Sequence, residues 1–173
     1  MAPTSAVRVA FVGAGYMASE HLRAFAACPD VELVGIHSLS NHLSEALTKT
    51  YPELNVFPSI EALHRQTSAD LVVIAVPELA CQIVCEQAFQ HPWTLLIEKP
   101  VGYSLTQARQ IEQKAAALGA KAYVALNRRF YGSTLQLQNA LQSTEGHRVV
   151  TILDQEDAES ALAAGQPPEV VHN

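Results

Sequence analysis

An unbroken apolar run limits this chain to few folds. Residues 71–76 read Leu-Val-Val-Ile-Ala-Val, with no polar alternation and with β-branched side chains at most positions. A strand of this composition is buried on both faces, as a central strand of a parallel sheet is. Parallel strands need long crossover connections, which are usually helices. The run therefore predicts an α/β fold with helices on both faces of a sheet.

The segments around this run repeat a strand–helix rhythm. Ser59 and Ser104 stand where a side chain caps the first turn of a helix, Gln107 completes a capping box with Ser104, and Gly119 provides a stop. Repeated β-α-β units imply a doubly wound parallel sheet with right-handed crossovers. Strands are predicted at 7–12, 31–37, 55–57, 71–76, 94–97 and 122–126, and helices at 17–27, 43–50, 60–64, 78–89 and 105–118.

The pattern changes after residue 126. Residues 127–130 read as a polar turn, 133–142 as a helix and 147–153 as one more strand. The tail, 154–173, is acidic, then rich in alanine, then broken by glycine and proline. We expect residues 1–126 to form one domain, and residues 127–173 to be the connecting helix and first strand of a second, incomplete α/β domain, because this remainder is shorter than an independent domain usually is.

The predicted strand 147–153 has apolar side chains but no obvious partner strand. An exposed strand edge leaves N–H and C=O groups unpaired. We therefore expect this segment either to be disordered or to pair with the same segment of another copy, and we expect the tail after Ala164 to be flexible.

Composition argues against several classes of protein. Of the 173 residues, 49% are hydrophobic and only 16% are charged, which disfavours a disordered chain. The net charge of −6 disfavours nucleic-acid binding, which needs a basic face. Nothing resembles a targeting segment, and no apolar run has the length of a membrane span.

The cysteines point to a reducing compartment. Cys28, Cys81 and Cys85 are odd in number and form no CxxC pair, so the cytoplasm is the expected location. Cys81 and Cys85 share a helix face, and we expect them to be buried apolar side chains, because two ligands do not make a metal site. No metal is predicted. Four histidines scattered over helices and loops are expected to lie at the surface or to be satisfied by neighbours: His21, His42, His64 and His91.

A glycine-rich turn lies between the first predicted strand and the first predicted helix. Residues 13–18 read Gly-Ala-Gly-Tyr-Met-Ala, which is GxGxxA. In such a turn Gly13 permits the tight bend, Gly15 lets the backbone approach a pyrophosphate, and Ala18 lets the helix pack closely on the sheet. The helix N-terminus offers free N–H groups to the phosphates. In this strand–turn–helix context the motif predicts a Rossmann fold that binds NAD or NADP.

The choice between NAD and NADP depends on the end of the second strand. NAD-specific domains usually place an acidic residue there to hold the ribose 2′-OH. Glu32 fits the spacing but lies at the start of its strand, at the edge remote from the cofactor, so a solvated role is expected for it. The residues expected to face the ribose instead are His37, Ser38, Leu39 and Ser40. None is acidic, which slightly favours NADP, although no arginine is present to bind the 2′-phosphate firmly.

Four motifs in order resemble the glucose–fructose oxidoreductase / inositol dehydrogenase / MocA family over about residues 7–131. They are the GxGxxA turn, Ala-Val-Pro at 75–77, Glu-Lys-Pro at 98–100 and Asn-Arg-Arg-Phe at 127–130. Together with the loop, the resemblance assigns cofactor contacts to Gly13, Ala14, Gly15, Tyr16, Met17, His37, Ser38, Ser40, Ala75, Val76, Pro77, Glu98, Lys99 and Pro100.

The resemblance also implies an activity. Members of the family transfer hydride between nicotinamide and a hydroxyl or carbonyl group of sugars, inositols and related small molecules, and most are homo-oligomers. The lysine matching Lys99 lies beside nicotinamide and substrate, and an ammonium there can stabilise and relay charge on the reacting oxygen. The proline matching Pro100 is often cis. Asn127 and Arg129 would lie on the substrate side, and Glu98 is expected to orient its neighbours rather than act as a base.

The sequence departs from the family pattern at three places. Pro77 is followed by Glu78 and Leu79, where many members have Pro-Asn-x-x-His. The ribose-binding acid is absent. The family's catalytic histidine belongs to the second domain, and His147 does not replace it, since it begins the strand that should enter that domain. We therefore expect an enzyme about twice as long as this chain, and expect the 173 residues alone to be inactive.

Two other functions remain open. One is a non-catalytic nucleotide-binding module, either an accessory subunit or a sensor, that lacks a substrate domain. The other is a methyltransferase that uses S-adenosylmethionine on a similar sheet. The second is weaker, because such enzymes seldom carry Glu-Lys-Pro after the fifth strand.

Overall fold

The structure is a computed structural model that describes residues 6–143, 145–153, 158–163 and 165. The chain divides into two compact units, Met1–Ala125 and Leu126–Asn173. Among the described residues, no helix is both long and apolar enough to cross a membrane.

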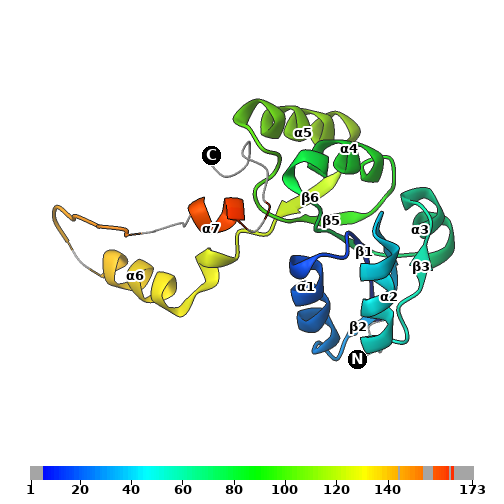
Figure 1. Cartoon of the computed structure of the whole chain (residues 1–173). Coiled ribbons are helices and arrows are strands. Elements are labelled where there is room, and N and C mark those ends of the chain that lie inside the picture. Colours follow the sequence, from blue (N-terminus) through cyan, green and yellow to red (C-terminus); the bar gives the residue numbers. More distant parts are fainter. Residues whose placement is uncertain (1–5, 144, 154–157, 164, 166–173) are drawn as a thin grey trace. The chain divides into compact units, whose positions relative to one another are not determined.

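The first unit is a six-stranded sheet with a helix in most connections (Figure 1). The strand order is β3-β2-β1-β4-β5-β6, and every neighbouring pair is parallel. This is the predicted doubly wound sheet. The strands are β1 (Val7–Val12), β2 (Val31–His37), β3 (Val56–Phe57), β4 (Leu71–Ile74), β5 (Thr94–Ile97) and β6 (Lys121–Val124); the helices are α1 (Tyr16–Ala26), α2 (Asn41–Thr50), α3 (Ile60–Thr67), α4 (Glu78–Ala88) and α5 (Leu105–Leu118).

Local capping explains where two of these helices begin. The Ser59 side chain accepts a hydrogen bond from the Ala62 N–H, and the Ser104 side chain accepts one from the Gln107 N–H. In a capping box the Gln107 side chain would accept from the N–H of the cap residue, Ser104. Here its Oε1 accepts instead from the N–H of the preceding residue, Tyr103, at 3.0 Å. Gly119 ends α5 in the left-handed conformation, as its position predicts.

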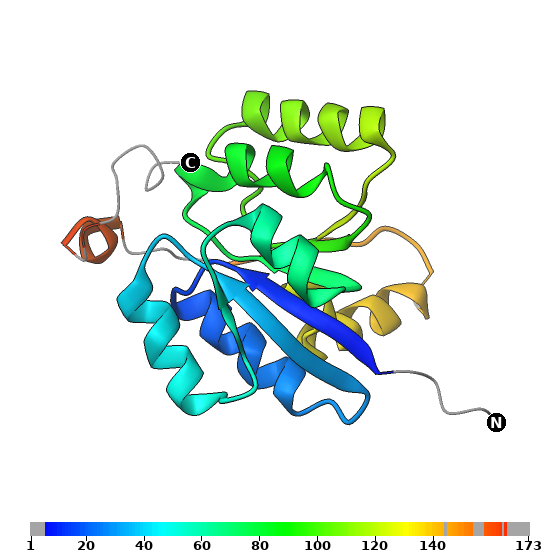
Figure 2. The ribbon, with the colours of Figure 1, turned by 90° about the vertical axis from the view of Figure 1, so that its right-hand side faces the viewer.

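Alternate residues of the strands build two cores, one on each face of the sheet. Val9 and Phe11 of β1 belong to the core under α1 and α2, whereas Ala10 and Val12 belong to the core under α3, α4 and α5. Figure 2 shows these two layers of helices on opposite sides of the sheet. Every position of a central strand therefore has an apolar environment, as the unbroken apolar run predicted.

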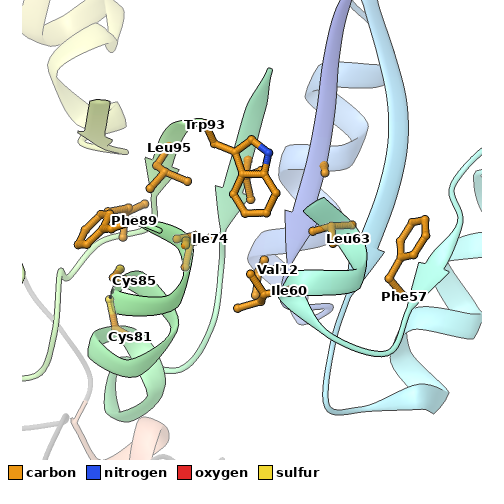
Figure 3. Close-up of a cluster of buried hydrophobic side chains, with 14 of the residues drawn as sticks. Val12, Phe57, Ile60, Leu63, Ile74, Cys81, Cys85, Phe89, Trp93 and Leu95 are labelled. Carbon is orange, nitrogen blue, oxygen red and sulfur yellow. Dashed lines mark hydrogen bonds between the residues drawn. The ribbon is translucent and has the colours of Figure 1, made fainter. Parts of the chain in front are cut away.

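The larger core packs α3, α4 and α5 against one face of the sheet, and Figure 3 shows part of it. Cys81 and Cys85 of α4 point into it, buried with their sulfur atoms 3.8 Å apart, so their expected role as buried apolar side chains is confirmed. The hydrogen bond with the Cys81 thiol, and burial after it, raise the pKa of Cys85 far above its ordinary value, which keeps that thiol protonated. Trp93, just before β5, is also buried here.

At the amino end of the sheet, Arg8 of β1 makes contacts with β2, with the segment before β4 and with the end of α3. Its guanidinium donates to the Thr67 carbonyl at the end of α3 and forms an ion pair of 2.7 Å with Glu32 on β2. Its backbone N–H donates to the Asp70 carboxylate before β4. Glu32 is thus exposed at the edge remote from the glycine turn, as expected, but it is paired with Arg8 rather than simply solvated.

The second unit holds η1, a 3-10 helix (Asn127–Phe130), α6 (Gly132–Gln142) and α7 (Ala158–Ala163). The strand predicted at 147–153 is wrong: these residues form no strand and join no sheet. Val149 and Leu153 are each 94% exposed, so no described segment supplies the hydrogen bonds or the apolar cover that a strand needs. Most of the tail beyond Leu153, including Pro167 and Pro168, lies outside the described residues.

Two histidines stack on each other beside Trp93. The His64 and His91 rings have centroids 4.2 Å apart, and the His91 side chain is only 10% exposed. Burial lowers the pKa of His91, and the His64 ring lowers it further; the Glu61 carboxylate, 3.7 Å from Nε2, opposes this but does not outweigh it.

This arrangement predicts a loss of stability in acid. Because folded His91 binds a proton less readily than unfolded His91, the unfolded state takes up more protons as the pH falls through about 6.5. We expect the free energy of unfolding, measured by urea titration, to fall between about pH 7.5 and pH 5.5. His91→Phe keeps the ring packing without the titration and should lose less over this range, whereas exposed His42→Gln should behave like the unmodified chain. Equal losses in all three proteins would contradict this account.

Candidate nucleotide-binding site

The last residues of four strands stand in register at one edge of the sheet. Val12 of β1 pairs with His37 on one side and with Ile74 on the other, and Ile74 pairs with Ile97. The residues that follow these strands therefore lie side by side at the carboxyl edge (Figure 1). The strand order reverses between β1 and β4, which is where sheets of this type bind ligands.

Gly13 makes the turn out of β1, and its backbone requires glycine. Its φ is +106°, and an added Cβ would lie 2.1 Å from the Ala75 carbonyl oxygen. Its N–H donates to the His37 carbonyl at 2.8 Å, and the next strand is joined in the same way by the bond from the Ala75 N–H to the Val12 carbonyl. The turn therefore packs between the carboxyl ends of β2 and β4 and is hydrogen-bonded to β2.

Gly15 is different, because the fold itself does not require glycine there. Its φ of −76° suits any residue, and an added Cβ would meet nothing within 4 Å. Gly15 is the N-cap of α1 and makes no side-chain cap, and the first turn holds no acidic residue. The first N–H groups of α1 are thus left for an external acceptor, and the space in front of Gly15 is open to it. These features fit a pyrophosphate.

The end of β2 carries hydroxyl and imidazole groups. His37 Nδ1 lies 3.0 Å from the Phe57 carbonyl, which holds the ring against β3. Ser38 Oγ accepts from the Ser40 N–H at 3.1 Å, so its own hydroxyl proton is free to point elsewhere. Ser40 is the N-cap of α2 and makes no side-chain cap. No carboxylate occurs between residues 37 and 44, the segment that follows β2 into α2.

The segment after β4 leads directly into α4. Ala75 and Val76 follow the strand, which ends at Ile74, two residues earlier than predicted. Pro77 is exposed and serves as the N-cap residue of α4. These residues lie between the glycine turn and the segment after β5, and their contact with a cofactor stays a prediction.

Glu98 and Lys99 follow β5 and have contrasting environments. The Glu98 side chain is only 10% exposed, with Oε1 2.8 Å from His21 Nε2 and Oε2 accepting from the Lys99 N–H at 3.0 Å. Lys99 is exposed, and among the described residues nothing pairs with its ammonium group. The Lys99–Pro100 peptide bond is cis, in agreement with the expectation from the resemblance.

His21 was not predicted to belong to this site. It was expected only to lie at the surface or to be satisfied, and its carboxylate partner lies 77 residues further along the chain. No local pattern marks such a pair. Among the described residues, moreover, no group of three or more His, Cys, Asp or Glu side chains is arranged to hold a metal ion.

Asn127 and Arg129 belong to the second unit. Both are exposed on η1. A substrate role for them stays a prediction.

Comparison with known proteins identifies the family. A family model described as an oxidoreductase family with an NAD-binding Rossmann fold matches residues 7–126. The chain belongs to this family. It is the glucose–fructose oxidoreductase / inositol dehydrogenase / MocA family that the four motifs indicated, and residues 7–126 are its NAD(P)-binding Rossmann domain.

Individual relatives are considerably longer than this chain. Glucose-6-phosphate 3-dehydrogenase of Bacillus subtilis is 24% identical over 145 residues, and D-glucoside 3-dehydrogenase of Escherichia coli is 27% identical over 144 residues. These alignments cover 84% and 83% of this chain but only 41% and 40% of the relatives. The chain thus spans about two fifths of the length of these relatives. Myo-inositol dehydrogenase of Lactobacillus casei, solved with NAD(H) and myo-inositol, shares the fold, with a TM-score of 0.74 at 20% identity over 80% of this chain and 42% of that one.

The Gly13 geometry predicts a large cost for a single methyl group. Gly13→Ala combines a positive φ with a clash against the Ala75 carbonyl, so we expect the free energy of unfolding to fall by about 2–4 kcal/mol. Gly15→Ala adds the same methyl group to open space and should cost less than about 1 kcal/mol. Urea unfolding of both variants measures this difference, and similar values for the two would show that the turn does not depend on Gly13.

Proposed function

We propose that this chain is the nucleotide-binding part of an oxidoreductase that transfers hydride between a nicotinamide nucleotide and a hydroxyl or carbonyl group of a sugar, an inositol or a related polyol. The observation that carries the proposal is the shared carboxyl edge, where the Gly13–Gly15 turn and the Lys99 segment follow strands that end in register. Family membership supports the reaction class.

The pyrophosphate is assigned to the N-terminus of α1. Gly15 leaves room for it, and the N–H groups of the first turn donate to it. The adenosine half then extends toward His37 and Ser38, and the nicotinamide half toward the segments after β4 and β5. We assign cofactor contacts to the residues of these segments that the sequence analysis predicted.

NADP is slightly favoured over NAD. Ser38 and Ser40 present hydroxyl groups at the end of β2, where an NAD-specific domain would place a carboxylate. Hydroxyl groups can donate hydrogen bonds to a 2′-phosphate and do not repel it.

Lys99 is assigned the proton-handling role. The bound nicotinamide supplies or accepts the hydride, and the substrate oxygen must lose or gain a proton at the same time. The Lys99 ammonium can donate to that oxygen and stabilise its developing charge. Its freedom from any described partner leaves it available for this contact.

The substrate class comes from the relatives. Two of them are dehydrogenases of glucose derivatives, glucose 6-phosphate and D-glucosides. We propose a polyol or sugar-like substrate of the same chemistry, and we assign Asn127 and Arg129 to its binding. Homo-oligomer formation and a cytoplasmic location stay predictions.

Nucleotide binding is tested at Gly15. Gly15→Val should leave the fold intact, since the side chain enters open space, but should fill the place of the pyrophosphate. We expect the affinity for NADPH and NADH, measured by titration calorimetry, to fall at least about tenfold, which is about 1.4 kcal/mol. Ala26→Val, at the exposed far end of α1, is the matched control. Unchanged affinity in Gly15→Val would overturn the assignment of the phosphate site.

The role of Lys99 is tested in a form of the protein that turns over substrate. Lys99→Ala should lower kcat about 100-fold or more while changing nucleotide affinity little, because the contact strengthens as charge develops on oxygen. Lys114→Ala, on the exposed surface of α5, should leave both unchanged. Near-normal turnover in Lys99→Ala would assign the proton path to another group, whereas a complete protein with no measurable turnover would favour the non-catalytic module.

A further inference from the structure

We infer that His21 is a positioning residue that acts through Glu98 to hold the Lys99 segment in register with the nucleotide-binding end of α1. The inference rests on the proposed function, since the role of Lys99 belongs to that proposal. The contacts that carry it stand independently of the nucleotide.

The pair is short and well covered. His21 Nε2 and Glu98 Oε1 are 2.8 Å apart, and the two side chains are only 17% and 10% exposed. An exposed ion pair contributes little to stability, but a covered carboxylate that loses its donor is left unsatisfied, which is costly. The contact therefore constrains both partners.

Both carboxylate oxygens of Glu98 are used. While Oε1 meets the imidazole, Oε2 accepts from the Lys99 N–H at 3.0 Å, and the Glu98 N–H donates to the Ile74 carbonyl. Because a carboxylate only accepts, His21 Nε2 must carry the proton in this contact. The chain of bonds runs from the imidazole through the carboxylate to the peptide of Lys99.

The helix that carries His21 also carries the phosphate loop. Gly15 is the N-cap of α1 and His21 lies six residues further on, which is about 9 Å along the helix axis. One rigid element thus presents N–H groups to the pyrophosphate at its end and a hydrogen-bond donor to Glu98 at its side. Any shift of α1 moves the phosphate-binding N–H groups and the donor to Glu98 together. The position of Lys99 relative to the bound nucleotide is therefore kept.

A purely packing role for His21 predicts different behaviour. The ring also stacks near Phe25, with centroids 6.5 Å apart and planes at 28°. His21→Phe keeps an aromatic ring for this packing but removes the donor. His21→Gln loses the ring but keeps an N–H group that can reach Glu98.

The experiment uses amide resonances of the labelled chain, with NADPH as the probe. In His21→Phe, the Lys99 N–H should exchange with solvent about tenfold faster, corresponding to the loss of about 1.4 kcal/mol from its hydrogen bond. NADPH affinity should stay within about twofold, because the phosphate loop is untouched. The shift of the Lys99 resonance on NADPH binding should fall by at least about half.

His21→Gln should restore both Lys99 signals, and Arg23→Gln, on the exposed surface of the same helix, should match the unmodified chain. Unchanged Lys99 exchange in His21→Phe would overturn the inference. A parallel loss of stability and NADPH affinity in both His21 variants would make His21 a packing residue, which also overturns it. If the unmodified chain binds no NADPH, the proposed function fails, while the exchange measurement still decides the link from His21 to Lys99.

Discussion

The hydrogen-bonded register of the central strands is the constraint on which the rest of the molecule depends. Val12, Ile74 and Ile97 end three parallel strands at the same level. The backbone bonds continue one residue further, since the N–H groups of Ala75 and Glu98 donate to the preceding strands. One ladder of main-chain hydrogen bonds therefore fixes where the glycine turn and the lysine segment begin. Their approximate relative position does not depend on any side chain.

Most of the fold was predictable because its signals are local. The apolar run at 71–76, the serine caps and Gly119 each act within a few residues, and the structure confirms the strands, helices and caps they predicted. Where the predicted and observed ends of an element differ, they differ by one to three residues, as at β4. The strand at 147–153 failed because a strand, unlike a capped helix, needs a partner to satisfy its backbone.

The candidate site was predictable in a different way. Motif and fold class place Gly13, Gly15 and Lys99 at one edge, because strand ends in a doubly wound sheet meet there. The His21–Glu98 pair could not be found in this manner. It joins residues 77 apart, and its existence depends on the rotation of α1 over the sheet, which no single segment determines. The stacked His64 and His91 rings escaped prediction for the same reason.

The two glycines of the turn separate what the fold requires from what a ligand requires. Gly13 has a positive φ and lies against the Ala75 carbonyl, so the sheet alone demands glycine there. Gly15 has an ordinary φ and open space in front of it, so nothing in the described protein demands glycine there. A serine or aspartate would cap α1 better by accepting from its first N–H groups. A glycine that leaves those donors unused, beside open space and without acidic neighbours in the first turn, makes physical sense when an external anion completes the helix end. The geometry of Gly15 thus connects the fold to a phosphate-bearing cofactor more directly than the motif does.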